Sequence, residues 1–270
     1  MSQFASHRAR KRFGQNFLHD HGVINNILRA IAPRPDEHVV EIGPGQGALT
    51  EGLLAGGSKV DVIELDHDLH ALLLASFATN PHFTLYKGDA LKFDFRQLIK
   101  GDQKLRVVGN LPYNISTPLM FHLLKSADCI TDMHFMLQKE VVQRLAAGAG
   151  EKHYGRLGIM VQYHCQVEHL FNVGPGAFTP APKVDSAIVR LTPHARLPHP
   201  ADDVLRLEEV VREAFNQRRK TLRNTLKSLL DADTLADEGI DPTVRPEQVD
   251  LAGFVRLANR LTRDRGYLNE

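Results

Sequence analysis

The sequence has little of several features that would place it outside the ordinary globular proteins. It contains only two cysteines, Cys129 and Cys165, and they do not form a C-x-x-C pair. This excludes a disulfide framework and a thiolate zinc centre, and it is typical of a reducing compartment. We also predict no metal site at His19-Asp20-His21, because this spacing fits no common zinc pattern. A loop leading into a helix is the better interpretation.

Long apolar runs are missing as well. No stretch approaches the roughly 20 apolar residues that a membrane-spanning helix requires. The basic start of the chain is not followed by the apolar segment of a secretory signal. We therefore expect a cytoplasmic protein that does not contact a membrane.

The chain also carries almost no net charge, +1 at pH 7 from 33 Lys and Arg against 32 Asp and Glu. Any affinity for RNA must therefore come from local clusters and not from bulk charge. Two basic clusters are present, and we predict that both contact RNA. Taken singly, each is equally typical of a solvated surface. The predicted RNA contacts are Arg10, Lys11, Arg12, Arg218, Arg219, Lys220 and Arg223.

From residue 38 onward, short apolar runs alternate with amphipathic segments. This alternation indicates βαβ units and a mostly parallel sheet. Beyond Pro193 and Pro200 the apolar period becomes helical. We therefore predict an α/β domain over residues 1–198, which includes the basic N-terminal segment, and a small all-helical C-terminal domain over residues 199–270. Strands are expected at residues 38–42, 59–65, 83–86, 105–108, 133–137 and 187–191.

A glycine-rich turn follows the first of these strands, over Glu41–Gly47. Glycine lets the backbone pass close to a ligand, and such a turn lines the ligand crevice of doubly wound sheets. Glu64 ends the next strand, 21 residues after Gly43, where a carboxylate can bind both hydroxyls of a ribose. Up to this point the pattern fits both NAD and S-adenosylmethionine.

Two further features favour S-adenosylmethionine. The turn reads G-x-G-x-G and lacks the third spacing of the dinucleotide fingerprint, and Glu41 precedes it. An acid beside the turn suits a cationic ligand better than a diphosphate. Asp89 ends the following strand and can accept a hydrogen bond from an adenine amine, although a helix N-cap is the alternative interpretation.

The fourth strand ends in Asn110-Leu111-Pro112-Tyr113, and an isolated match of this kind is equally typical of a turn with a buried tyrosine. In the chemical interpretation, the Asn110 side-chain oxygen and the Leu111 carbonyl accept hydrogen bonds from an adenine amine during methyl transfer. Pro112 stiffens this segment and Tyr113 stacks on the base. Phe178 could stack on the other face of an unstacked base, with ordinary loop packing as the alternative.

With these segments the chain resembles the KsgA family of small-subunit ribosomal RNA adenine dimethyltransferases over essentially its whole length. The resemblance implies a Rossmann-like, S-adenosylmethionine-dependent methyltransferase domain and a helical C-terminal domain. It also implies dimethylation of two adjacent adenines in a hairpin near the 3′ end of 16S ribosomal RNA. The implied substrate is a pre-30S particle late in assembly, and we expect a monomer. The matching segments cover residues 10–18, 41–47, 62–66, 88–90, 110–118, 136–141, 154–157 and 178–186.

The resemblance also assigns site residues. Contacts to the target adenine are implied at Asn110, Leu111, Tyr113 and Phe178, with Pro112 as the stiff wall beside them. Contacts to the cofactor are implied at Asn16, Leu18, Gly43, Gly45, Glu64, Asp89 and Asn110.

Three alternatives remain at this stage. A large-subunit adenine methyltransferase of the macrolide-resistance type shares Gln15-Asn16-Phe17, but Leu111 and the segment 180–186 favour the small subunit. An assembly or transcription factor that keeps the fold without catalysis would have no need of the intact Asn-Leu-Pro-Tyr segment. In an NAD oxidoreductase, the third alternative, the Asn-Leu-Pro-Tyr segment would have no role in hydride transfer.

Overall fold

The computed structural model describes residues 15–217 and 219–266, which form two compact units. One unit runs to Val142 and includes Val167–Pro193. The other includes Gln143–Gln166 and the chain from His194 onward. The predicted domain boundary at residue 198 lies a few residues after Pro193. Nothing in the sequence pattern predicted that residues 143–166 belong to the second unit.

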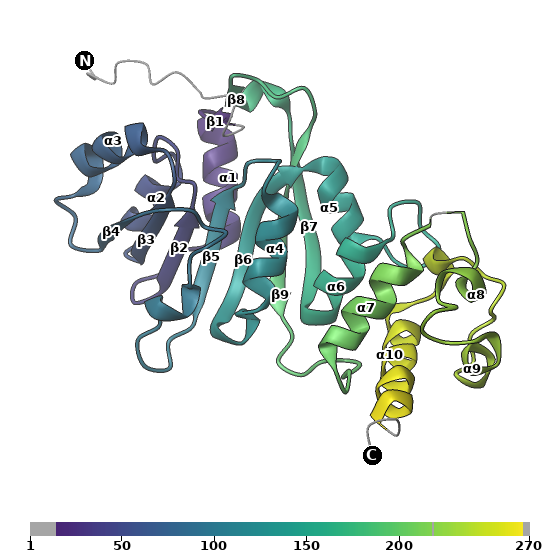
Figure 1. The fold of residues 1–270 in the computed structure, drawn as a ribbon. Helices are drawn as coiled ribbons and strands as arrows, with labels where there is room; N and C mark the ends of the chain where they lie inside the picture. Colours follow the sequence, from purple (N-terminus) through teal and green to yellow (C-terminus); the bar gives the residue numbers. More distant parts are fainter. Residues whose placement is uncertain (1–14, 218, 267–270) are drawn as a thin grey trace. The chain divides into compact units, whose positions relative to one another are not determined.

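A seven-stranded sheet forms the first unit, in the order β4-β3-β2-β5-β6-β9-β7 (Figure 1). Neighbouring strands from β4 to β6 are parallel, and β9 is antiparallel to β6. The predicted mostly parallel sheet is therefore confirmed. The strands are β2 (His38–Ile42), β3 (Lys59–Glu64), β4 (Phe83–Lys87), β5 (Leu105–Asn110), β6 (Ile130–Gln138), β7 (Cys165–Val173) and β9 (Ser186–Pro193).

Two very short strands make a second, separate sheet. β1 (Phe17–Leu18) pairs antiparallel with β8 (Phe178–Thr179). Neither strand was predicted, because two residues carry no detectable alternation. This pairing brings the N-terminal segment beside the loop that precedes β9.

The central strands are apolar because helices cover both faces of a parallel sheet. All five residues of β2 are buried, and Val39, Val62 and Val108 are completely inaccessible. The polar exceptions near the carboxyl ends of the strands are Glu41 in β2 and Glu64 in β3. They therefore belong to the site and not to the core.

Five α-helices begin in the described part of the first unit, with α4 in front of the sheet in the view of Figure 1. Asp20 caps α1, since its side chain accepts a hydrogen bond from the Val23 amide at 3.0 Å. The interpretation of His19–His21 as a loop leading into a helix is thus confirmed. The helices are α1 (His21–Ile31), α2 (Thr50–Ala55), α3 (His67–Phe77), α4 (Ser116–Leu124) and α5 (Lys139–Ala146).

The second unit contains a helical C-terminal part, as predicted. The apolar pattern over residues 204–230 is divided between α7 and α8, because the chain turns between them. Leu207, Val210 and Leu257 are fully buried in this unit. Its helices are α6 (Arg156–His164), α7 (Val204–Ala214), α8 (Leu222–Thr225), α9 (Ala232–Asp237) and α10 (Leu251–Gly266).

Candidate active site

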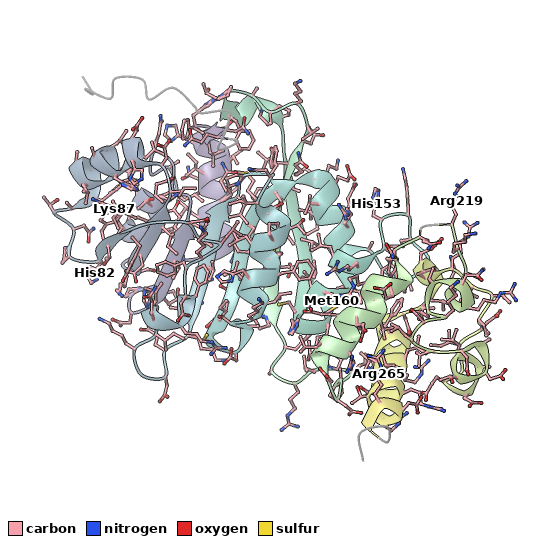
Figure 2. The ribbon with its side chains drawn as sticks, in the orientation of Figure 1. His82, Lys87, His153, Met160, Arg219 and Arg265 are labelled. Atoms are coloured by element: carbon pink, nitrogen blue, oxygen red, sulfur yellow. The ribbon has the colours of Figure 1, made fainter. Side chains whose placement is uncertain are left out.

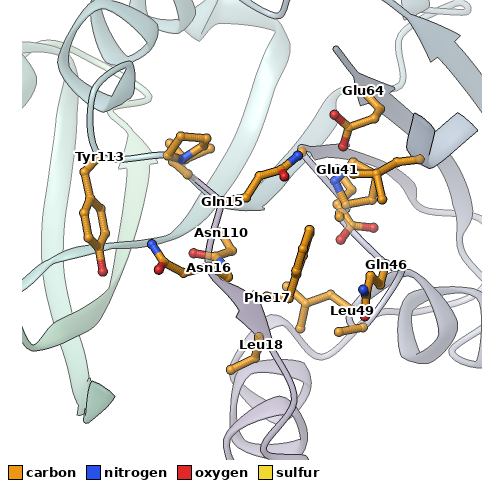
Figure 3. A pocket seen from close by; sticks show the side chains of 17 residues that line it. Gln15, Asn16, Phe17, Leu18, Glu41, Gln46, Leu49, Glu64, Asn110 and Tyr113 are labelled. Atoms are coloured by element: carbon orange, nitrogen blue, oxygen red, sulfur yellow. Dashed lines mark hydrogen bonds between the residues drawn. The ribbon is translucent and has the colours of Figure 1, made fainter. Parts of the chain in front are cut away.

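A pocket of about 730 Å³, counting its open mouth, lies at the carboxyl ends of β2, β3 and β5. In Figure 3, Asn16 and Asn110 lie between Tyr113 on one side and Glu41 and Glu64 on the other. The lining residues are Gln15, Asn16, Phe17, Leu18, Glu41, Gly43, Pro44, Gly45, Gln46, Ala48, Leu49, Glu64, Leu69, Asn110, Leu111, Pro112 and Tyr113.

The glycine turn forms one wall of this pocket. Gly43, Gly45 and Gly47 all have positive φ, at 64°, 60° and 88°, a conformation that glycine adopts most readily. A Cβ atom on Gly47 would come within 2.5 Å of the Phe77 ring. The sequence thus predicted the position of the turn, and the close passage of a ligand along its glycines remains a prediction.

Two carboxylates are buried beside the turn. Glu41 is 2% exposed and accepts a hydrogen bond from the Thr50 hydroxyl at 2.5 Å. Burial raises its pKa to about 7, and the nearby Glu64 adds to this effect. Burial also raises the pKa of Glu64, which is 6% exposed and accepts a hydrogen bond from the Asp66 amide at 2.8 Å. Among the described residues, no cation offsets the charge of either group.

The donor set of the pocket fits a positively charged ligand. Among its described lining residues there is no Lys, Arg or His, whereas both carboxylates face it. A sulfonium or ammonium group would supply the missing positive charge, and a diphosphate would meet repulsion. The pocket therefore argues against the NAD alternative. Most of the residues expected to hold S-adenosylmethionine line it.

Asn110 lies at the pocket edge with its amide already oriented. Its Nδ2 donates a hydrogen bond to the Asn16 carbonyl at 3.0 Å. This contact directs the Oδ1 atom, the predicted acceptor, away from Asn16. Leu111 donates its amide to the Met136 carbonyl at 3.2 Å, which fixes the peptide that follows. Two of the predicted acceptors are thus held by the ends of β5 and β6.

Tyr113 also lines the pocket, and its hydroxyl lies 2.8 Å from the Oγ atom of Ser186. Ser186 is 1% exposed at the start of β9. The hydrogen bond restrains the phenol ring at its far end, so the ring face is held in place. Ser186 was not among the predicted site residues, because 73 residues separate it from Tyr113.

Two predicted site residues do not line the pocket. The Asp89 Oδ1 atom accepts a hydrogen bond from the Leu91 amide at 3.0 Å, which is a turn-capping contact. Phe178 is 3% exposed and opposes Leu18 across the β1–β8 pair. The burial of Phe178 matches the packing alternative that the sequence left open, whereas Asp89 caps a turn and not the helix of its alternative interpretation. Their roles in binding remain predictions.

Several lining residues had no predicted role. Gln15 and Phe17 belong to the segment before α1, and a Cβ atom on Gly45 would come within 3.1 Å of the Phe17 ring. Gln46 lies in the glycine turn and Leu49 lies just after it, and both line the pocket. The sequence signal that could have found Gln15 and Phe17 is their position beside Asn16.

The predicted RNA contacts are only partly described. Arg10, Lys11, Arg12 and Arg218 lie outside the described residues. Arg219, Lys220 and Arg223 are exposed in the second unit, and Figure 2 shows the Arg219 side chain extending outward. The described residues offer these three cations no ion-pair partner.

Two further observations concern the described residues as a whole. None of their helices has both the length and the apolar composition needed to cross a bilayer. They also contain no group of three His, Cys, Asp or Glu side chains arranged to hold a metal ion.

The sheet order, the glycine turn and the acidic pocket define a Rossmann-like methyltransferase. A dimethyladenosine transferase from Plasmodium falciparum is similar in structure, with a TM-score of 0.77 and 26% identity over 92% of this chain and 98% of that one. The 23S rRNA methyltransferase ErmE is similar with a TM-score of 0.71 and 26% identity, over 92% and 100% of the two chains.

Sequence relatives narrow the class further. The profile of the family described as ribosomal RNA adenine dimethylase matches residues 6–263. The ribosomal RNA small subunit methyltransferase A of Pseudomonas aeruginosa is 69% identical over 97% of each chain. The protein of the same name from a Marinomonas species is 58% identical over 98% of this chain and 100% of its own. The chain therefore belongs to the ribosomal RNA adenine dimethylase family.

Proposed function

We propose that this enzyme uses S-adenosylmethionine to dimethylate the N6 amines of two adjacent adenines in a hairpin near the 3′ end of 16S ribosomal RNA. The proposal rests above all on the Asn110 amide, which is oriented at the rim of a pocket lined by carboxylates and free of described cations. The names of the 58–69% identical relatives support a small-subunit substrate.

The cofactor contacts that we propose surround the glycine turn. When bound, S-adenosylmethionine supplies an electrophilic methyl group on a positively charged sulfur. The Glu64 carboxylate accepts hydrogen bonds from the ribose hydroxyls, and the turn allows the ligand to approach the backbone closely. The complete proposed set is Asn16, Leu18, Gly43, Gly45, Glu64, Asp89 and Asn110.

The proposed catalytic residues act on the adenine amine. The amine is a poor nucleophile because its lone pair is delocalised into the purine ring. The Asn110 Oδ1 atom and the Leu111 carbonyl accept hydrogen bonds from its N–H groups, which favours a pyramidal nitrogen and stabilises the positive charge that develops on it. Alignment of the amine with the methyl group supplies much of the remaining acceleration.

Stacking holds the base in this geometry. Tyr113 presents its ring beside Pro112, with the hydroxyl restrained by Ser186. Phe178 is proposed to stack on the opposite face. Because it is buried opposite Leu18, its ring reaches a base only after the β1–β8 pair shifts.

We further propose that the basic clusters contact RNA in a cytoplasmic pre-30S particle, and that the enzyme acts as a monomer without a metal. Arg219, Lys220 and Arg223 are exposed and free of described ion pairs, which leaves their charge available for phosphates. Arg10, Lys11, Arg12 and Arg218 complete the proposed contacts.

The test is methylation of immature ribosomal subunits by the purified protein, with dimethyladenosine mapped by mass spectrometry. We expect four methyl groups on small-subunit RNA and none on large-subunit RNA. Label confined to large-subunit RNA would establish the ErmE-like alternative. Absence of S-adenosylmethionine binding in calorimetry would instead favour an assembly factor without catalysis.

A further inference from the structure

Residues 15–19, which we call the strap, run along one side of the pocket. Its first four residues all line the pocket, between the carboxylates and Tyr113 (Figure 3). The Phe17 ring lies against Gly45 in the glycine turn. A ligand in this pocket would contact the strap, so the contacts that hold the strap bear on how the ligand is bound.

On the target side, backbone contacts hold the strap. The Asn16 carbonyl accepts the Asn110 amide at 3.0 Å, and the His19 amide donates to the Ala177 carbonyl at 3.0 Å. The β1–β8 pair adds strand pairing next to Phe178. These contacts use main-chain atoms of the strap and therefore do not depend on its side chains.

On the cofactor side, a side chain provides an anchor. Gln15 Nε2 donates a hydrogen bond to Asp66 Oδ2 at 2.8 Å. Asp66 is 1% exposed, and its Oδ1 atom accepts the Asp68 amide as the N-cap of α3. The Asp66 amide in turn donates to Glu64 Oε1 at 2.8 Å. Gln15 is thus joined through one residue to the carboxylate proposed to bind the ribose.

We propose that Gln15 is a positioning residue for the cofactor, acting through this hydrogen bond to Asp66, which we call the latch. The inference rests on the proposed function. The latch holds the strap beside the bound ligand and fixes the loop that carries Glu64. Its loss opens the cofactor side of the pocket while the Asn110–Asn16 contact stays in place.

The neutral amide suits this position for an electrostatic reason. Asp66 is already close to Glu64, and its negative charge contributes to the raised pKa of that group. A lysine at position 15 would bind Asp66 but would also repel a cationic ligand. A glutamine anchors the strap and leaves the negative field of the pocket unchanged.

The test exploits the direction of the latch. In Gln15→Glu, two carboxylates face each other and the latch breaks. In the double variant Gln15→Glu/Asp66→Asn, the new asparagine can donate to the new glutamate, and asparagine also caps a helix well. Gln97→Glu serves as the charge-matched control, because Gln97 is exposed and does not line the pocket.

Calorimetry should show that Gln15→Glu raises the Kd for S-adenosylmethionine and for S-adenosylhomocysteine about tenfold, the effect expected for a charge-assisted hydrogen bond. The double variant should recover most of that loss. Gln97→Glu should leave binding of S-adenosylmethionine unchanged. With saturating S-adenosylmethionine, the kcat of Gln15→Glu on immature subunits should stay within about threefold, since the Asn110 contact is retained.

Two results would overturn the latch alone, with wild-type methylation intact. One is an unchanged Kd in Gln15→Glu, and the other is an equal loss in the single and double variants, which would indicate general damage to the strap. A wild-type protein that binds no S-adenosylmethionine would overturn the latch and the proposed function together.

Discussion

We call the side of the central sheet where the parallel strands begin the amino edge, and the side where they end the carboxyl edge. Among the described residues, buried charged side chains have partners of opposite charge at the amino edge but not at the carboxyl edge. At the amino edge, Asp61 lies 2.7 Å from His38 and 3.2 Å from Lys59. Burial alone would raise its pKa, but the hydrogen bonds and charges of these two partners hold the pKa below its usual value. At the carboxyl edge, Glu41 and Glu64 have raised pKa values and face no described cation.

The difference separates structural charges from functional ones. A buried ion needs a partner, because desolvation is otherwise too costly. At the amino edge the partners are built into the chain. At the carboxyl edge the partner is missing from the described residues, so a cationic ligand can take its place. Unpaired buried carboxylates therefore mark the functional edge of this sheet.

The largest expected effect lies at the amino edge, at Arg106. Its guanidinium makes a two-pronged contact with Asp132, at 2.9 Å for both bonds, and donates to Glu37 at 2.7 Å and to the Ile31 carbonyl at 2.6 Å. Arg106→Ala leaves Asp132 without its main partner. We expect urea denaturation to show a loss of about 3–5 kcal/mol in unfolding free energy.

The matched control for Arg106 is a surface arginine of the same sheet. Arg190 pairs with Glu168 where both side chains are substantially exposed, and Arg190→Ala should cost less than about 1 kcal/mol. Equal losses in the two variants would show that burial of the pair does not distinguish them.

The functional edge was more predictable from sequence than its surroundings. The apolar patterns of the strands predicted the positions of Glu64 and Asn110, because each residue lies at the end of a strand. Parallel strands bring their carboxyl ends together, so the two side chains had to meet at one edge. Local patterns were sufficient for these positions.

Contacts between distant short segments were not predictable. The β1–β8 pair joins two-residue strands, and the Tyr113–Ser186 bond spans 73 residues, so neither leaves a periodic signal. Asp89 was expected beside the cofactor, yet its oxygen caps a turn in this structure. Sequence reasoning named the chemistry of such a residue but could not choose between two hydrogen-bond partners.

The second prediction concerns catalysis at Asn110. Asn110→Ala removes an acceptor for the adenine amine and should lower kcat by about 10²–10³, with RNA affinity unchanged. Asn110→Asp keeps an acceptor oxygen and should lose less. Initial rates on immature small subunits, together with filter binding, measure both quantities. An alanine variant with unchanged turnover would remove Asn110 from the mechanism.

The third prediction uses the raised pKa of Glu41. Folding favours its protonated form, so this stabilisation is present below pH 4.5 and is lost as pH rises through about 7. Glu41→Gln should therefore be more stable than wild type at pH 8 by about 2–3 kcal/mol, with most of the difference gone at pH 5. Urea denaturation at both pH values measures it.

Glu41→Gln should also bind S-adenosylmethionine more weakly at pH 8, because the charge that attracts the cation is gone. Glu51→Gln, at an exposed position of α2, is the control and should change neither quantity. Equal pH dependence in wild type and Glu41→Gln would show that Glu41 does not titrate in this range.

The smallest expected effect lies at His134 in β6, whose pH dependence is opposite to that of Glu41. This residue is 3% exposed, and its Nδ1 atom lies 3.8 Å from the Asp132 carboxylate. Burial lowers its pKa from 6.5 to about 4. The neutral ring is therefore favoured on folding, and stability is lost as pH falls from 6.5 towards 4.

His134→Leu removes this titration while keeping a side chain of similar volume. At pH 7.5 the variant should lie within about 1 kcal/mol of wild type, since the lost packing is small. At pH 5 wild type should have lost about 1–2 kcal/mol that the variant retains. The exposed His82 gives the control, because His82→Leu should leave the acid side of the curve unchanged. If His134→Leu lost as much stability in acid as wild type, some other group would carry the acid sensitivity, and the opposite pH dependences assigned to Glu41 and His134 would not hold.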